Sequence, residues 1–203
     1  MLNAETPRLK FALYGAHSSL GNALLCELLS RQHEAVTLVD DFNSMTVRPG
    51  LRAKTGDLFD AVSVSQSVAG MDAVICLYDS PSLATASGEA ANRQPHDFYQ
   101  AVDALLSGLP NVGVERLLLV ADLTAKRDDP NVEAALQRIA AHPLRWTLVD
   151  VEAAGDDLSI EDFTVLDDLS ADDRRVQLRR IAAGIVDELE TPQHLHQQIH
   201  FRI

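Results

Sequence analysis

Residues 10–39 read KFALYGAHSSLGNALLCELLSRQHEAVTLV, and this stretch decides the fold. Its first run, KFALY, is apolar and ends at Gly15, and the LGNALLCELL that follows carries apolar residues at helical spacing. The closing run, AVTLV, is β-branched and ends in front of two aspartates. The stretch therefore predicts a buried strand (residues 9–14), a tight glycine turn, a helix (20–29) and a second strand.

The same alternation of strand and helix continues to residue 151. Further strands are predicted at residues 51–55, 73–78, 117–121 and 146–151, and further helices at 60–69, 97–106 and 132–141. This order implies right-handed βαβ crossovers. The predicted fold class is α/β: a Rossmann-type, doubly wound and mostly parallel sheet with helices on both faces. We expect a single domain over residues 1–203.

The regular alternation of strand and helix in the core at residues 1–151 does not continue after residue 151. Residues 152–203 are expected to complete this core with a short C-terminal helix and strand. We expect a short strand at 163–166 and a final strand at 197–203. Between them, Ser170 and Asp173 resemble a capping box at the start of a helix that runs to about Glu190.

Composition limits the classes of function. The net charge of −13 over 203 residues argues against nucleic acid and against an anionic membrane surface as partners. No apolar run approaches the roughly 18 residues of a membrane span, and residues 1–10 show no apolar signal region. A cytoplasmic protein is the expectation, with Cys26 and Cys76 as buried thiols.

The loop GAHSSLG at residues 15–21 stands where a dinucleotide fold binds pyrophosphate. Gly15 supplies the turn, Gly21 permits close packing of helix on strand, and the loop amides up to Leu20 face the anion. Two alternatives stay open for the middle position: the Cβ of Ser18 crowds the pyrophosphate, or the hydroxyls of Ser18 and Ser19 donate to it.

Two flanking residues of this loop also have alternative readings. His17 either contacts a phosphate or points into solvent. Asp40, about 20 residues beyond Gly21, is placed to accept hydrogen bonds from ribose hydroxyls. With Asp41 beside it, NAD is predicted in preference to NADP, because a 2′-phosphate would meet two negative charges. Alternatively, the two aspartates only end a strand and begin a turn.

The stretch at residues 10–39 resembles the start of atypical short-chain dehydrogenases/reductases, the NAD(P)H-binding or NmrA-like family. GDLFD, VAGMDAVI, VERLLLVAD and the tail IAAGIVDELETPQHLHQQIHF extend the resemblance over most of the chain. It implies that Asp57 lies near the adenine ring and that Leu77 and Tyr78 line the nicotinamide side. The family usually has Gly where Ser18 stands, and relatives build a substrate lobe where this chain is short and acidic.

The Tyr-x-x-x-Lys motif of short-chain reductases, in which the lysine lowers the pKa of the tyrosine, is missing. The residual catalytic candidates are Tyr78, Thr124 and Lys126, and the alternative is an ordinary polar loop. His196 and His200 share one face of the final predicted strand but are poorly spaced as ligands, and the acidic pairs after residue 155 are expected to be solvated. No metal site is predicted.

Three functions remain open from the sequence. The first is an NAD-dependent oxidoreductase that acts on a small carbonyl or quinone substrate, for which the Tyr-Lys pair is not essential. The second is a non-catalytic dinucleotide sensor or interaction module. The third is a family member that has lost nucleotide binding. Either a monomer or a homodimer is compatible with the sequence.

Overall fold

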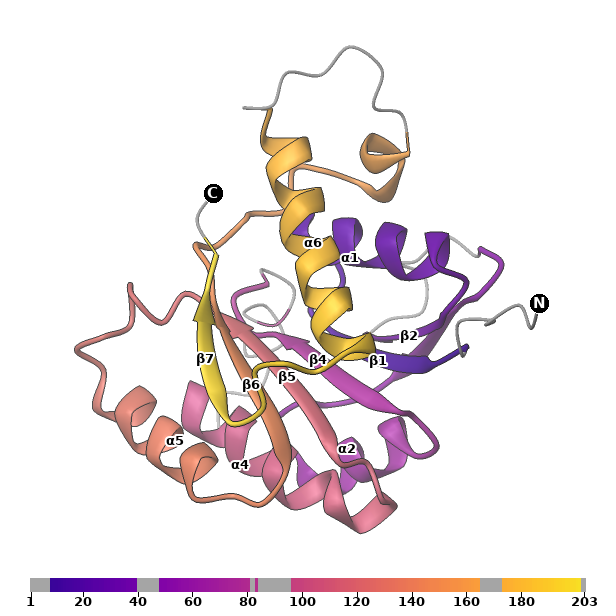
Figure 1. Cartoon of the computed structure of the whole chain (residues 1–203). Helices are drawn as coiled ribbons and strands as arrows, with labels where there is room; N and C mark the ends of the chain where they lie inside the picture. The colour runs from indigo at the N-terminus through magenta and orange to yellow at the C-terminus, as the bar shows by residue number, and fades with distance from the viewer. Residues whose placement is uncertain (1–7, 40–47, 81–82, 84–95, 165–172, 202–203) are drawn as a thin grey trace.

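A computed structural model describes residues 8–39, 48–80, 83, 96–164 and 173–201 (Figure 1). Within these ranges, seven strands pair in parallel in the order β3-β2-β1-β4-β5-β6-β7. They are β1 (Lys10–Tyr14), β2 (Glu34–Val39), β3 (Leu51–Thr55), β4 (Ala73–Leu77), β5 (Arg116–Ala121), β6 (Arg145–Asp150) and β7 (Gln197–His200). The doubly wound α/β prediction is confirmed.

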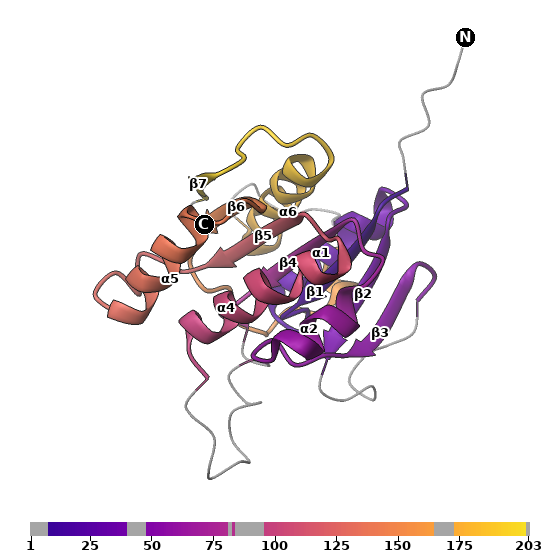
Figure 2. The same cartoon turned by 90° about the horizontal axis from the view of Figure 1, so that it is seen from below.

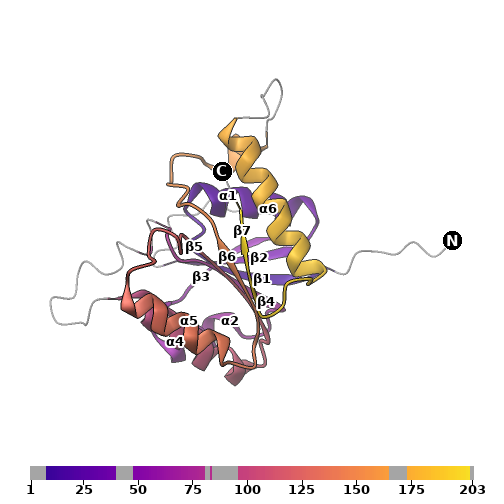
Figure 3. The same ribbon diagram turned by 60° about the vertical axis from the view of Figure 1, so that its left-hand side comes forward.

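Helices cover both faces of this sheet. They are α1 (Ser19–Ser30), α2 (Ala61–Val68), α4 (Phe98–Gly108), α5 (Pro130–Ala140) and α6 (Arg174–Glu190), with short 3₁₀ turns η2 (Pro110–Val112) and η3 (Ile160–Phe163). Figure 3 shows α1 and α6 on one face, and Figure 2 looks onto α2, α4 and α5 on the other. Strands β4 and β5 are buried along their whole length because both of their faces are covered.

Strand β1 lies at the point where the strand order reverses. The chain passes from β1 to β2 and β3 on one side, and then crosses to β4 on the other side of β1. The loops after β1 and β4 therefore leave the sheet in opposite directions and open a crevice at its carboxyl edge. The Gly15 loop begins in this crevice.

The C-terminal part corrects two sequence predictions. Residues 160–163 form the 3₁₀ turn η3 and not the start of a strand, because Ser159 and Asp162 make a capping box there. Phe163 is fully buried beneath this turn. Helix α6 is capped by Asp173, whose carboxylate accepts the Arg175 amide, and not by a box beginning at Ser170, which lies outside the described residues.

The two histidines near β7 are both exposed, and each has its own hydrogen-bond partner. His196 precedes the strand in the left-handed region, with φ 58°, and its Nε2 donates to the carbonyl of Leu144 at 2.9 Å. His200 bonds through Nδ1 to the carboxylate of Asp150 at 2.9 Å. Both histidines thus attach the last strand to β6 and its approach. No group of metal-ligating side chains occurs among the described residues.

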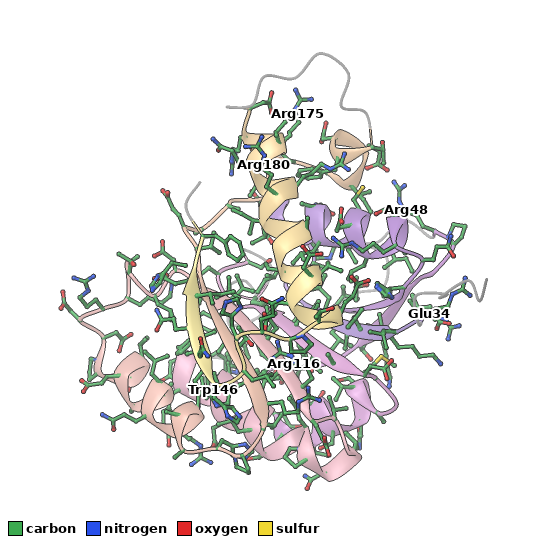
Figure 4. All side chains as sticks on the ribbon, viewed as in Figure 1. Glu34, Arg48, Arg116, Trp146, Arg175 and Arg180 are labelled. Carbon is green, nitrogen blue, oxygen red and sulfur yellow. The ribbon has the colours of Figure 1, made fainter. Side chains whose placement is uncertain are left out.

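A buried ion pair joins α6 to the opposite, amino edge of the sheet. Arg116 donates to Thr147 Oγ1 at 2.8 Å and to Glu188 Oε1 at 3.2 Å, and both charged residues are 5% exposed (Figure 4). Burial lowers the pKa of Arg116 to about 10. Burial opposes ionisation of Glu188, but hydrogen bonds from His194 and from backbone amides lower the pKa of its carboxyl. Both partners are therefore charged at neutral pH.

Helix α6 is the longest described helix, and neither it nor any other described helix is long and apolar enough to cross a bilayer.

Candidate functional site

Two glycines fix the shape of the loop between β1 and α1. Gly15 has φ +79°, and a Cβ there would run into the carbonyl oxygen of Leu77 and lie 2.8 Å from Ser80 Cβ. A Cβ on Gly21 would lie 2.6 Å from the Ala16 carbonyl oxygen. The loop is therefore pressed against the end of β4, and the first turn of α1 is pressed against the loop. This close approach is what a backbone cradle for an anion requires.

Ser18 is the N-cap of α1, and its hydroxyl is directed into the loop. It accepts the Gly21 amide at 3.0 Å and donates to the Gly15 carbonyl at 3.1 Å. The backbone at Ser18 is extended, with φ −76°, so the residue needs no special conformation. The sequence left open whether Ser18 crowds a pyrophosphate or donates to it. In this arrangement its hydroxyl donates to the Gly15 carbonyl and so stabilises the turn. His17 beside it is partly buried.

The first turn of α1 meets a segment that the sequence reasoning treated as solvated loop. The Ser19 amide donates to the Gly155 carbonyl at 2.8 Å. The Ser19 hydroxyl donates to Asp157 Oδ1 at 3.1 Å and accepts the Leu158 amide at 3.1 Å. Ser19 has no exposed surface as a result. The Ser19 amide and hydroxyl, which the sequence predicts to donate to a pyrophosphate, are thus hydrogen-bonded to Gly155 and Asp157 of the same chain.

The space above the loop is small in this arrangement. A pocket of about 30 Å³ lies between the carboxyl ends of β4, β5 and β6, lined by Ser18, Leu77, Asp79, Ala121, Val151 and Ala154. Sites for drug-sized ligands usually measure 300–1,000 Å³. A larger hollow of about 440 Å³ lies at the ends of β2 and β3, against α2. The close approach of backbone at Gly15 and Gly21 suits a dinucleotide, while the pocket above the loop is far smaller than such a ligand.

Asp57, which the family resemblance implies to lie near the adenine ring, lines the larger hollow. Its Oδ1 accepts the Phe59 amide at 2.8 Å, and its own amide donates to Ser63 Oγ at 2.8 Å. These bonds hold the turn after β3 in place. Asp40, the predicted ribose partner, lies outside the described residues, so its role stays a prediction.

Tyr78 and Lys126 come together at the ends of β4 and β5, but the ammonium group of Lys126 is paired with a third residue, Asp79. Lys126 pairs with the carboxylate of Asp79, and its Nζ lies 6.0 Å from the centroid of the Tyr78 ring. Burial, aided by the charge of Asp79, raises the pKa of Tyr78 to about 12. Thr124 is engaged elsewhere, because its hydroxyl donates to Asp150 at 3.0 Å. A neutral, unactivated phenol is the opposite of what proton transfer by the family tyrosine needs.

Two tyrosines make the fold sensitive to high pH. Burial raises the pKa of Tyr78 to about 12 and also raises that of Tyr14, which bonds to Ser67 at 3.1 Å. A folded-state pKa above the unfolded value near 10 stabilises the fold fully below pH 10, and the stabilisation is lost as the pH rises toward 12. We expect the free energy of unfolding in urea to fall over this range, and less steeply in Tyr78→Phe. Identical slopes for the two proteins would contradict this assignment.

Comparison with known proteins agrees with this geometry. A family model described as NAD(P)H-binding matches residues 15–192. No curated protein sequence matches the chain. A Rossmann-fold NAD(P)-binding family protein from Shigella flexneri superposes with a TM-score of 0.67 at 16% identity, covering 96% of this chain and 93% of that one.

Two further solved structures share the fold. A short-chain dehydrogenase/reductase of the wide type from Veillonella parvula, in complex with NADP, gives a TM-score of 0.63 at 10% identity, covering 96% of this chain and 94% of that one. A proposed NADH-flavin reductase from Streptococcus pneumoniae gives 0.58 at 19% identity, with 95% and 98% covered. At these identities the likeness establishes the Rossmann architecture and nothing finer.

Proposed function

The chain belongs to the NAD(P)H-binding family, and from this premise we propose that it binds a nicotinamide dinucleotide across the loop at residues 15–21. One observation carries the proposal: Gly15 and Gly21 sit where any side chain would collide with backbone, at the reversal of the strand order. Such a loop, followed by a helix N-terminus, brings amide groups and a partial positive charge to a pyrophosphate.

The remaining parts of the dinucleotide follow from this position. Asp57 at the 440 Å³ hollow is proposed to face the adenine, and Leu77 and Tyr78 the nicotinamide side. Asp40 is proposed to bind the ribose and, with Asp41 beside it, to favour NAD over NADP. This proposed arrangement is the one that the resemblance to the atypical, NmrA-like short-chain dehydrogenases/reductases implies.

The proposed activity is hydride transfer to a quinone-like or flavin-like acceptor. When bound, the dinucleotide would supply the hydride. The chain would contribute orientation and not a proton, since Tyr78 keeps its proton and Lys126 is paired with Asp79. An acceptor that takes its proton from solvent suits these residues better than a carbonyl that needs an activated tyrosine.

A second candidate is a dinucleotide sensor without turnover. The same Lys126–Asp79 ion pair favours it, because the pair cancels the charge that would activate a tyrosine. Oxidation of NADH, followed by absorbance with quinone and flavin acceptors, separates the two candidates: binding without turnover for any acceptor favours the sensor.

Thermal unfolding with NAD, NADH, NADP and NADPH tests dinucleotide binding. A ligand bound only by the native state adds about 2.7 kcal/mol at 100 times its Kd, which for this size raises Tm by roughly 5–10 °C. We expect NAD and NADH to give the larger shifts. An Asp40→Asn, Asp41→Asn double variant is expected to narrow the difference from NADP. If none of the four dinucleotides moves Tm, the proposed function is wrong.

A further inference from the structure

Residues 154–158 lie directly on the proposed phosphate cradle. The Gly155 carbonyl accepts the Ser19 amide, and the Asp157 carboxylate accepts the Ser19 hydroxyl. Asn22, one turn further along α1, donates its side-chain amide to the Leu158 carbonyl at 2.9 Å. Oxygen acceptors of the chain therefore occupy the first turn of α1, where phosphate oxygens would bind.

A clasp from α6 holds this segment in place. Arg174 Nη1 donates to both oxygens of Asp157, at 2.9 and 2.8 Å, and Nη2 donates to the Ala154 carbonyl. The side chains of Arg174 and Asp157 are 42% and 61% exposed. Ion pairs so open to solvent are weak, because water and salt compete with them. The clasp can therefore open without disturbing the core.

The segment is anchored at both ends and loose in the middle. Val151 before it is 4% exposed, and Ile160 and Phe163 after it are 9% and 0% exposed. Between these anchors, Ala154 is the buried side chain, while residues 152, 153, 155, 156 and 157 are exposed. Leu158 is partly buried against the core, so opening would expose the side chains of Ala154 and Leu158 and would break the hydrogen bonds to Ser19 and Asn22.

The charges of the segment oppose an anion while it is closed. Glu152, Asp156 and Asp157 carry negative charge, and the carboxylate of Asp157 contacts Ser19 directly. Hydrogen bonds from its own amide, from Ser19 and from Arg174 lower the pKa of the Asp157 carboxyl. Asp157 is thus ionised at neutral pH and competes with a pyrophosphate for the same donors.

We propose that residues 154–158 are a displaceable plug: Gly155 and Asp157 hold the donors meant for the pyrophosphate, and a dinucleotide binds after the Arg174 clasp opens. The inference rests on the proposed function and adds its regulation. The apparent affinity for the dinucleotide is the intrinsic affinity multiplied by the fraction of open molecules. Any change that favours opening therefore raises the apparent affinity. The independent sign of a ligand here is the NAD(P)H-binding family match, which spans both loop and plug.

Calorimetric titration with NADH tests the plug through Asp157→Ala. This variant removes the competing carboxylate and breaks the clasp but leaves the loop intact. The Kd for NADH is expected to fall three- to tenfold, and Arg174→Ala should lower it in the same direction. Arg175→Ala is the matched control, because Arg175 pairs with Asp173 at the start of α6 and does not touch the plug. Its Kd should equal that of the unmodified protein.

Amide hydrogen exchange at Ser19 gives a readout without ligand. Exchange should be at least tenfold faster in Asp157→Ala than in Arg175→Ala. If the exchange is faster and NADH binds with an unchanged Kd, the plug is wrong and the proposed function stands. If the exchange is faster and no variant binds any dinucleotide, the proposed function is wrong. Unchanged exchange at Ser19 would show that residues 154–158 do not cover this amide, which overturns the plug directly.

Discussion

Replacing Gly15 with alanine is expected to lower the free energy of unfolding by about 2–5 kcal/mol and to abolish dinucleotide binding. A left-handed conformation costs an alanine about 1–2 kcal/mol. The added Cβ would also meet the Leu77 carbonyl and Ser80, and forced overpacking costs about 1–3 kcal/mol more. Urea unfolding measures the loss, and thermal shift with NADH measures the binding.

Gly70→Ala is the matched control for this prediction. Gly70 has the same φ of +79°, but a Cβ there would meet nothing within 4 Å. We expect it to lose only the conformational cost, about 1–2 kcal/mol, and to keep its dinucleotide binding. Equal losses for Gly15→Ala and Gly70→Ala would mean that the contact with β4 does not shape the loop.

The second large effect is expected from Glu188→Ala. The variant leaves the guanidinium of Arg116 buried without a counter-charge, and breaking a buried ion pair in this way typically costs 3–5 kcal/mol. It also removes the acceptor for the backbone amides of Gln193 and His194, which lead into β7. We therefore expect the urea midpoint to fall strongly and the loop before β7 to lose protection in hydrogen exchange.

Asp187→Ala, one residue away on the same helix, serves as the control. Asp187 pairs with Arg31, but its side chain is 68% exposed, so its loss should cost less than about 1 kcal/mol. An Arg116→Met, Glu188→Leu double variant removes both charges and should recover most of the stability. A double variant as unstable as Glu188→Ala would show that the hydrogen bonds, and not the unpaired charge, dominate.

The sequence was sufficient to predict the strands and helices of the sheet because buried parallel strands have a recognisable local sequence pattern. AVICL and RLLLVA are continuous apolar runs, and their helices carry apolar residues at the helical period. The strand predicted at residues 163–166 was wrong at its start, because Phe163 ends the 3₁₀ turn that Ser159 and Asp162 cap. Residues 165 and 166 lie outside the described residues. Asp173 was predicted at the third position of a capping box that begins at Ser170, whereas it is itself the N-cap of α6, because a short acidic side chain can take either position.

The glycines of the site could be predicted from the sequence, but the contact of residues 154–158 with the loop could not. Gly15 and Gly21 are marked by their position between a strand and a helix. The bond from Ser19 to Asp157 joins residues 138 apart, and no local pattern announces such a contact. Asp79 was not singled out from the sequence, although it is the second residue after β4, at the carboxyl edge where ligands bind, and this position was the available signal.

Helix α1 packs against α6, so α1 reaches its final packing only after the ribosome has synthesised α6 (Figure 1). About 150 residues separate the two helices, so at 5–20 residues per second a ribosome completes α6 roughly 8–30 s after α1. Throughout that interval Leu24, Leu25 and Leu28 lack their final partners, while α2 and α4 can already cover the other face. During synthesis one face of the sheet is therefore covered only in part, and chaperones that bind leucine-rich surfaces can bind the nascent chain at that face.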